Sequence, residues 1–225
     1  MIISHYYKFI FIKPRKVAGT TIELALSPFL EAGDLATSIQ PEEEKLRITK
    51  KGVLIGNIYR KNYFGLPSRL RDHSTLLKAY SLFDRSLESY IVVSACRNPW
   101  DRAVSNFFWS KRNTNISQET HDIQKKEFLK FTNFYGPKTW MDYFYGRKRQ
   151  RRLNSWHLYS YKKVCKADYF IRFENLETDL SNLQKLLGLP SSPVIADFHA
   201  KSKSRPKTSQ AWQKFYDLKT QELVA

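Results

Sequence analysis

Residues 8–27 read KFIFIKPRKVAGTTIELALS, and this stretch decides the fold. Its opening apolar run predicts a buried strand over residues 8–12. A basic loop follows, and from Ile22 onward the apolar residues fall at helical spacing, which predicts a helix over residues 20–30. A strand, a tight loop and a helix in this order direct backbone N–H groups and the positive end of the helix dipole at one point. The stretch is therefore suited to hold a phosphate or a sulfate.

The side chains of the loop support an anion site but argue against a triphosphate site. In a nucleoside-triphosphate P-loop the lysine follows the glycines, whereas here Lys16 precedes the single glycine, Gly19. Gly19 lets the backbone approach an anion closely, and Thr20 and Thr21 offer hydroxyls at the helix start. The alternative that stays open is an ordinary helix start with solvated lysines.

A second stretch with anion-binding character begins where a buried strand is predicted to end, at residues 90–96. Arg97 follows this strand, and α/β sheets bind their ligands at the ends of such strands. Asn98 is a good helix cap and precedes proline, which predicts a helix over residues 99–111. One face of that helix carries Asn98, Arg102, Ser105 and Trp109. For Arg102, a surface ion pair with Asp101 or a nearby acidic residue is the alternative.

The rest of the chain alternates between strand and helix patterns. Strands are predicted over residues 52–59 and 168–172, and helices over 75–83, 174–187 and 212–225. The last of these helices looks cut off before its natural end. Residues 60–72 are predicted to be a loop, and Cys96 to lie in the core. Strands that alternate with helices favour a parallel α/β sheet, and the length suits a single domain over residues 1–225.

Composition narrows the class of partner. The chain has 225 residues, of which 42% are hydrophobic and 15% aromatic, so it is long and apolar enough to build a core. A net charge of +17 points to anionic partners, such as a nucleotide, a sulfated or phosphorylated sugar, a nucleic acid or a membrane surface. No apolar run is long enough to cross a bilayer and no signal-peptide pattern opens the chain, so the expected location is cytoplasmic. The oligomeric state is left open.

The two anion-binding stretches together resemble the donor-binding signatures of the sulfotransferases, which use 3′-phosphoadenosine 5′-phosphosulfate (PAPS). RKVAGTT resembles the loop that holds the 5′-phosphosulfate, and RNPWDRAVSNFFW resembles the segment that holds the 3′-phosphate. FENLETDLSNLQKLLGL resembles a late helix of the family. The nearest group is that of the heparan and chondroitin 2-O-sulfotransferases and their bacterial relatives. Their loop reads P-K-T-A-G-T-[ST], where this chain has Arg15 in place of proline and Val17 in place of the first threonine.

The resemblance implies a P-loop-NTPase-like three-layer α/β fold, with a central, mostly parallel sheet flanked by helices. It also assigns the donor's contacts. The residues expected to bind the 5′ side of the donor are Arg15, Lys16, Ala18, Gly19, Thr20 and Thr21. Lys16 is additionally expected to stabilise the leaving phosphate oxygen. Arg97 and Ser105 are expected to bind the 3′-phosphate. Lys203 and Arg205 are expected to close over the donor, with a solvated basic loop as the alternative.

Sulfuryl transfer is an in-line displacement in which the acceptor hydroxyl loses a proton, so a base that titrates near neutrality serves it best. Of the five histidines, His73 is the candidate base because it lies between the two donor stretches and relatives carry a histidine in a comparable place. A capping or hydrogen-bonding histidine is the alternative. Lysine, hydroxyls and backbone donors can neutralise the leaving group, so no metal is expected.

The acceptor region is predicted over residues 134–163, where aromatic residues alternate with cations. Trp140, Arg147 and His157 are the candidate substrate-binding residues, and a carbohydrate hydroxyl is the expected acceptor. A helix core with a solvated charged face is the alternative. Two rival functions stay open, a nucleoside-triphosphate-dependent phosphotransferase and a basic nucleic-acid-binding module.

Overall fold

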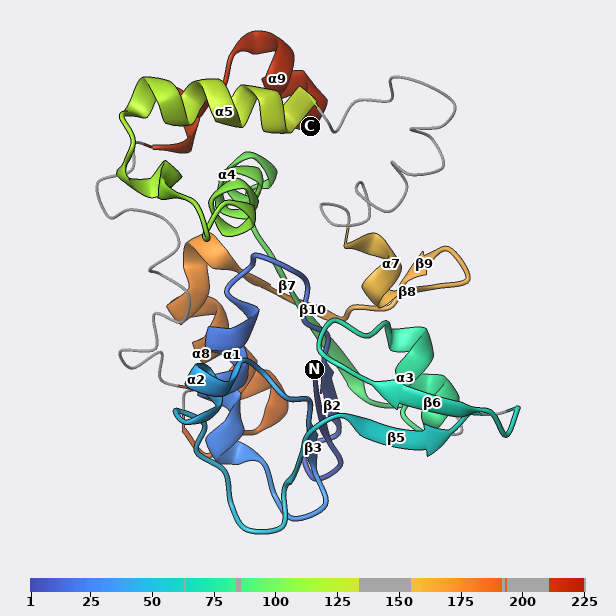
Figure 1. The fold of residues 1–225 in the computed structure, drawn as a ribbon. Helices are drawn as coiled ribbons and strands as arrows, with labels where there is room; N and C mark the ends of the chain where they lie inside the picture. The colour runs from blue at the N-terminus through green and yellow to red at the C-terminus, as the bar shows by residue number, and fades with distance from the viewer. Residues whose placement is uncertain (63, 84–85, 134–154, 192, 194–210, 225) are drawn as a thin grey trace. The chain divides into compact units, whose positions relative to one another are not determined.

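The computed structural model describes residues 1–62, 64–83, 86–133, 155–191, 193 and 211–224. The chain divides into two compact units (Figure 1). Unit 1 comprises residues 1–96 and 155–200, and unit 2 comprises residues 97–154 and 201–225. The first anion-binding stretch and His73 belong to unit 1, whereas Arg97 and Ser105 belong to unit 2.

A six-stranded sheet forms the centre of unit 1, in the order β10-β7-β2-β1-β3-β4. β10 and β2 lie parallel to β7 on either side of it, and β3 is parallel to β4. β1 is antiparallel to both its neighbours. The strands are β1 (Ile2–Ser4), β2 (Phe9–Phe11), β3 (Leu35–Ala36), β4 (Leu54–Ile55), β7 (Ile91–Cys96) and β10 (Tyr169–Arg172). A mixed, mostly parallel sheet is thus confirmed.

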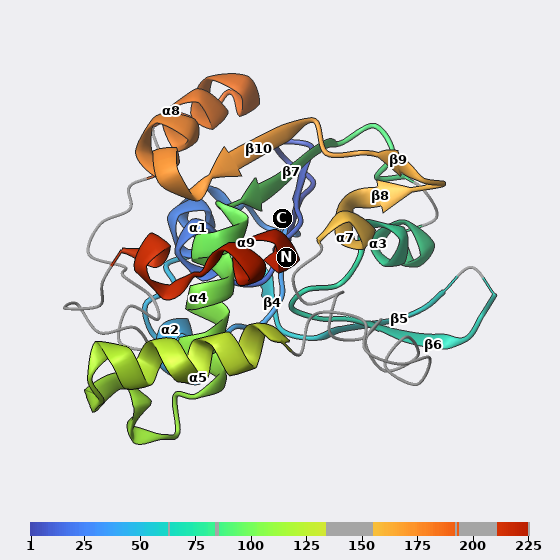
Figure 2. The same ribbon diagram turned by 90° about the horizontal axis from the view of Figure 1, so that it is seen from above.

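Helices cover both faces of this sheet because successive strand side chains point to opposite faces. Phe9 and Phe11 pack in one hydrophobic cluster with α1 (Gly19–Leu26) and α8 (Leu176–Leu187). Ile10 and Ile12 pack in the other cluster with α3 (Leu76–Leu82) and α7 (Trp156–Tyr159). Figure 2 shows α1 and α8 on one side of the sheet and α3 and α7 on the other. The predicted three-layer α/β architecture is confirmed.

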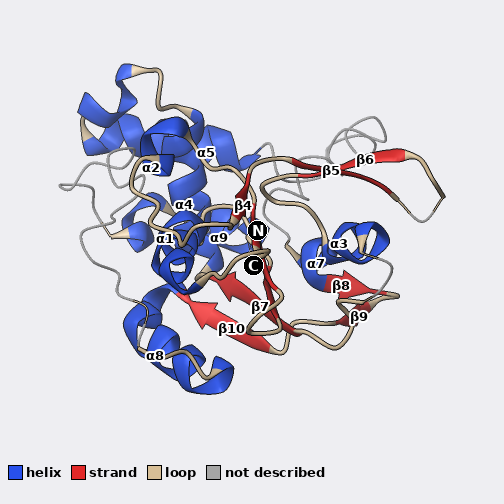
Figure 3. Ribbon diagram, turned by 90° about the horizontal axis from the view of Figure 1, so that it is seen from below, coloured by secondary structure: helices blue, strands red, loops and turns tan. Residues whose placement is uncertain are grey.

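Two hairpins accompany the central sheet of unit 1. β5 (Ile58–Lys61) pairs with β6 (Pro67–Leu70), and β8 (Ser160–Tyr161) pairs with β9 (Val164–Cys165). In Figure 3 the β5–β6 hairpin extends away from the central sheet. The short helices of this unit are η1 (Ser27–Phe29), α2 (Pro41–Glu44) and η3 (Phe173–Asn175).

Unit 2 is helical where it is described. It consists of α4 (Pro99–Ser110), η2 (Asn115–Gln118), α5 (His121–Asn133), η5 (Trp212–Phe215) and α9 (Leu218–Val224). Its core is aromatic, and Phe107, Phe128 and Phe215 are fully buried there. The indole of Trp100 stacks on Trp212 with 5.5 Å between ring centroids.

Several predicted boundaries were wrong. The predicted strand over 52–59 is two strands in different sheets, because Gly56 lies at a φ of 143° between them. The predicted loop over 60–72 contains β6. The helix predicted over 20–30 ends at Leu26, where Ser27 and a proline start a 3₁₀ turn. The C-terminal helix is split into η5 and α9. Cys96 is exposed, not buried, because it is the last residue of its strand.

No helix in the described ranges is long and apolar enough to cross a membrane.

Candidate donor and proton-transfer site

The loop between β2 and α1 has an alternating backbone. Lys16 has a φ of 63° and Ala18 a φ of 59°, whereas Arg15 and Val17 stay on the ordinary negative side. Left-handed residues other than glycine are unfavourable by about 1–3 kcal/mol each and gather at ligand-binding sites. Alternation of negative and positive φ is the pattern of anion-binding nests, in which successive N–H groups turn toward one point. The backbone therefore supports the anion site that the sequence predicted.

Helix α1 begins at this nest without a side-chain cap. Its N-cap residue is Ala18, whose side chain cannot accept a hydrogen bond. Gly19, Thr20 and Thr21 form the first turn and are all buried. The Thr20 hydroxyl makes no hydrogen bond to any residue that the structure describes. An uncapped first turn with buried hydroxyls suits an anionic group that accepts hydrogen bonds.

A buried ion cluster lies under the loop and was missed by the sequence analysis. The Lys13 ammonium lies 2.6 Å from Glu23 and 3.0 Å from Asp72, and Glu23 also contacts the Met1 ammonium. Burial lowers the pKa of Lys13, but the Glu23 and Asp72 charges outweigh it and leave that pKa raised. Glu23 interrupts the apolar helix sequence GTTIELAL, which was the available signal for a buried charge.

Gly19 has a structural role in this cluster. A Cβ atom at Gly19 would lie 2.5 Å from Cγ of Lys13, because the lysine side chain passes directly against the glycine. The absence of a side chain therefore lets Lys13 reach Glu23. The glycine was predicted to allow close approach of an anion, and the structure adds this packing requirement.

His73 contacts the same loop. Its Nδ1 lies 2.7 Å from the carbonyl oxygen of Lys13, and its Nε2 lies 3.4 Å from a carboxylate oxygen of Asp72. A carbonyl oxygen only accepts, so Nδ1 carries the hydrogen and Nε2 keeps its lone pair in the neutral ring. The backbone of His73 has a φ of 59°. An unfavourable backbone thus holds the ring against the anion loop.

Electrostatics keep this histidine neutral and its neighbour ionised. Burial lowers the pKa of His73 to about 4, and the positive charges of Arg15 and Lys13 act in the same direction. Burial raises the pKa of Asp72, but Lys13 and the other nearby cations outweigh it and bring that pKa to about 2. At neutral pH the site therefore presents an unprotonated Nε2 beside a carboxylate, and the pKa of His73 lies below the near-neutral value that the sequence analysis expected of the base.

Unit 2 contains the second predicted anion stretch, at the start of α4. The Asn98 side chain accepts hydrogen bonds from the N–H groups of Trp100 and Asp101, at 3.0 and 3.2 Å, which confirms it as the helix cap. Arg97 forms an ion pair with Asp101. Ser105 lies two turns along α4 and is half-buried. The pair with Asp101 holds the guanidinium at the beginning of the helix.

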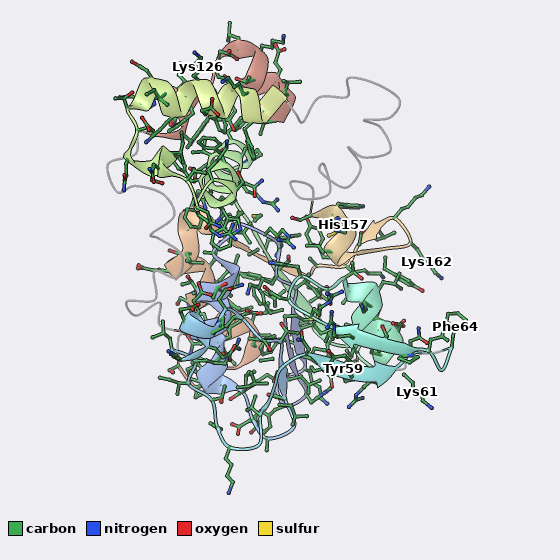
Figure 4. All side chains as sticks on the ribbon, viewed as in Figure 1. Tyr59, Lys61, Phe64, Lys126, His157 and Lys162 are labelled. Atoms are coloured by element: carbon green, nitrogen blue, oxygen red, sulfur yellow. The ribbon has the colours of Figure 1, made fainter. Side chains whose placement is uncertain are left out.

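The predicted substrate-binding residues and the two cations of the late basic loop lie mostly outside the described residues. His157 lies exposed on α7 of unit 1 (Figure 4). Trp140, Arg147, Lys203 and Arg205 lie outside the described residues. No group of three or more histidine, cysteine, aspartate or glutamate side chains in the described ranges is placed to hold a metal ion.

The sequence model of the sulfotransferase family matches residues 1–224, nearly the whole chain. The chain belongs to the sulfotransferase family. The match runs through the anion loop, His73 and the start of α4, so the site lies within the sulfotransferase sequence. No curated protein sequence matches the chain. For this sulfotransferase, sulfuryl transfer is the general chemistry that the site has to support.

Proposed function

We propose that this sulfotransferase moves a sulfuryl group from PAPS to an acceptor hydroxyl, with His73 as the base. The observation that carries the proposal is the contact between Nδ1 of His73 and the carbonyl oxygen of Lys13, at 2.7 Å. This contact holds a neutral imidazole at the loop that is suited to an anion. A base held next to an anion site is what transfer of a charged group to a hydroxyl requires.

The donor's 5′ side is assigned to the loop and the first turn of α1. The nest and the uncapped helix start fit a phosphosulfate, since both supply backbone N–H donors. The residues that would hold it are Arg15, Lys16, Ala18, Gly19, Thr20 and Thr21. Lys16 would stabilise the charge that develops on the leaving phosphate oxygen. Lys13 is not assigned to the donor, because its ammonium is already held by two carboxylates.

The donor's 3′-phosphate is assigned to Arg97 and Ser105. Arginine offers a planar pair of N–H donors that matches a phosphate. Lys203 and Arg205 stay candidates for closing over the donor. The family match spans both units, which supports the proposal that residues 1–225 form one sulfotransferase domain. The cytoplasmic location expected from the sequence stays a prediction.

His73 would accept the hydroxyl proton at Nε2. The bound donor supplies the sulfuryl group and a phosphate leaving group. Protonation makes the ring an imidazolium 3.4 Å from the Asp72 carboxylate, so Asp72 stabilises the charge that the base acquires. The Lys13 carbonyl accepts from Nδ1 in both protonation states and keeps the ring orientation constant. The acceptor is proposed to be a carbohydrate hydroxyl, with Trp140, Arg147 and His157 as its contacts.

A ligand-binding test separates this function from its two rivals. The unfolding temperature is measured with adenosine 3′,5′-bisphosphate, with ATP and magnesium, and with single-stranded DNA. A ligand at about one hundred times its Kd stabilises the folded chain by about 2.7 kcal/mol. Stabilisation by the bisphosphate is expected. Stabilisation by ATP alone would favour the phosphotransferase, and stabilisation by DNA alone would favour the nucleic-acid-binding module.

Two variants then test the assigned roles. Lys16→Ala is expected to weaken bisphosphate binding and to lower sulfate transfer, whereas the exposed Lys51→Ala serves as the matched control. His73→Asn is expected to keep bisphosphate binding and to lose most transfer of labelled sulfate from PAPS to a panel of glycans. Asparagine suits the left-handed backbone of this position. Unchanged transfer in His73→Asn would remove the histidine from the mechanism.

A further inference from the structure

The β5–β6 hairpin of unit 1 has hydrogen bonds from Phe64, Gly65 and Leu66 to Asn62 near its end. The Asn62 side chain accepts hydrogen bonds from the N–H groups of Phe64 and Leu66, each at 3.0 Å. The N–H of Gly65 donates to the Asn62 carbonyl at 2.8 Å, and its φ of 72° suits glycine. These bonds hold Phe64, Gly65 and Leu66 against Asn62, with Phe64 and Leu66 on either side of the glycine.

The tip exposes large apolar side chains. Phe64 is 81% exposed and Leu66 is 61% exposed. Exposed apolar residues at random positions are ordinary, but two together on a protruding tip mark an interaction site. Tyr59 of β5 is 68% exposed and lies further from the tip. An aromatic ring with a hydroxyl in that position suits the boundary between an apolar phase and water.

Cations follow the apolar tip along the hairpin in a fixed order. Lys61 pairs with Pro67 next to the tip, and Tyr59 pairs with Arg69 two residues further back. At about 3.4 Å of backbone rise per residue, the Arg69 position is about 7 Å further from the tip than the Lys61 position. The Arg69 guanidinium donates to the Tyr59 hydroxyl at 3.1 Å, which holds both side chains together. The hairpin therefore carries an apolar end followed by a band of positive charge.

The β8–β9 hairpin adds charge on the same side of unit 1. Its two turn residues, Lys162 and Lys163, have φ values of 48° and 62°, a conformation that usually requires asparagine or glycine. Both lysines are exposed. β6 and β8 both pack against α3, so the two hairpins flank one helix. Figure 4 shows Lys162, Lys61, Phe64 and Tyr59 on this side of unit 1.

We propose that the two hairpins form a docking surface for an anionic phospholipid membrane. The surface consists of Tyr59, Lys61, Phe64, Leu66, Arg69, Lys162 and Lys163. Phe64 and Leu66 enter the acyl boundary, Tyr59 lies at headgroup depth, and the cations contact the lipid phosphates. The order from apolar tip to cationic band matches the order from acyl chains to headgroups. A polysaccharide or a nucleic acid would supply the negative charge but would leave Leu66 without an apolar partner.

Vesicle binding tests the proposal, and it does so independently of the sulfotransfer reaction. The full chain is sedimented with phosphatidylcholine vesicles that contain either no anionic lipid or about 30% phosphatidylglycerol. Binding to the anionic vesicles is expected, and it should weaken with added salt because screening reduces the attraction of the cations. The double variant Phe64→Ser/Leu66→Ser should lose about tenfold or more in vesicle affinity. Lys162→Glu/Lys163→Glu should also lose affinity, chiefly at low salt.

Matched variants control for general effects. Leu218→Ser removes a leucine that is 83% exposed in unit 2, and Lys126→Glu reverses an exposed charge in unit 2 (Figure 4). Both should bind the anionic vesicles as the parent does, and all variants should keep the parent's unfolding temperature and bisphosphate binding. Equal affinity of the tip variant and the parent for the vesicles would overturn the proposal. Failure of the parent to bind the anionic vesicles, or tip-dependent binding to heparin or single-stranded DNA instead, would also overturn it.

Discussion

The pKa of His73 makes the stability of the folded chain depend on pH in a measurable way. That pKa falls from 6.5 for a free histidine to about 4 in the folded chain, because burial disfavours the imidazolium. Between these values the unfolded chain binds a proton that the folded chain does not bind. The free energy of unfolding must therefore decrease as the pH falls from the unfolded pKa toward the folded pKa. The contribution is fully present above the unfolded pKa.

The expected magnitude follows from the two pKa values. Lowering the pH from about 7 to about 4.5 should remove about 2 kcal/mol of stability through His73 alone. The variant His73→Asn lacks the titrating group, and asparagine tolerates the positive φ of this position. The free energy of unfolding that His73→Asn loses between the two pH values should thus be smaller than the parent's loss by about 2 kcal/mol.

Denaturant unfolding at the two pH values measures this difference. Carboxylates elsewhere also titrate, but they do so in both the parent and His73→Asn. Subtracting the loss of unfolding free energy in one protein from that in the other therefore cancels their contribution. His157→Asn is the matched control because His157 is exposed on α7, and its loss should equal that of the parent. Parallel losses in the parent and in His73→Asn would show that His73 is not held neutral by burial, and the electrostatic argument for the base would be wrong.

Three further predictions concern the residues around the loop. Lys13→Met should lower the free energy of unfolding in denaturant by about 3–5 kcal/mol, because Glu23 would keep a buried charge. The control Lys50→Met, at an exposed lysine, should lower it by less than about 1 kcal/mol. Equal losses in the two variants would contradict the buried cluster. Gly19→Ala should cost about 1–3 kcal/mol, since its Cβ meets the Lys13 side chain, and an unchanged unfolding midpoint would refute that packing. Cys96 should react with a thiol reagent without denaturant because it is exposed, and protection by adenosine 3′,5′-bisphosphate is expected since Arg97 follows it; a thiol that reacts only after unfolding would contradict its exposure.

The layered fold could be predicted because local patterns carry it. Phe9, Ile10, Phe11 and Ile12 are all buried, and they divide between two hydrophobic clusters according to the alternation of a strand. An unbroken apolar run of this kind predicts a strand covered on both faces, and no long-range information is needed. The cap at Asn98 is equally local, since its bonds reach only two and three residues ahead.

Features that depend on distant partners were not predictable. β1 has three residues and β3 has two, and only their pairing with neighbouring strands identifies them as strands. β6 contains proline and two polar residues, and its pairing with β5 makes it a strand. The contact of His73 with Lys13 spans 60 residues of sequence. The sequence indicated His73 as a candidate base, but neither its partner Asp72 nor its neutral state.

Lys13 and Lys16 differ by three positions in the sequence and yet have different roles. Lys13 follows a fully buried strand, so its ammonium could be kept inside only with compensating charges, and Glu23 and Asp72 supply them. The cluster holds Asp72 next to Nε2 of His73. The carbonyl oxygen of Lys13 contacts the other ring nitrogen, Nδ1. Lys16 lies at a left-handed position of the loop and is half-buried. We therefore expect substitution of Lys13 to act first on stability, and substitution of Lys16, the proposed donor contact, to act first on binding.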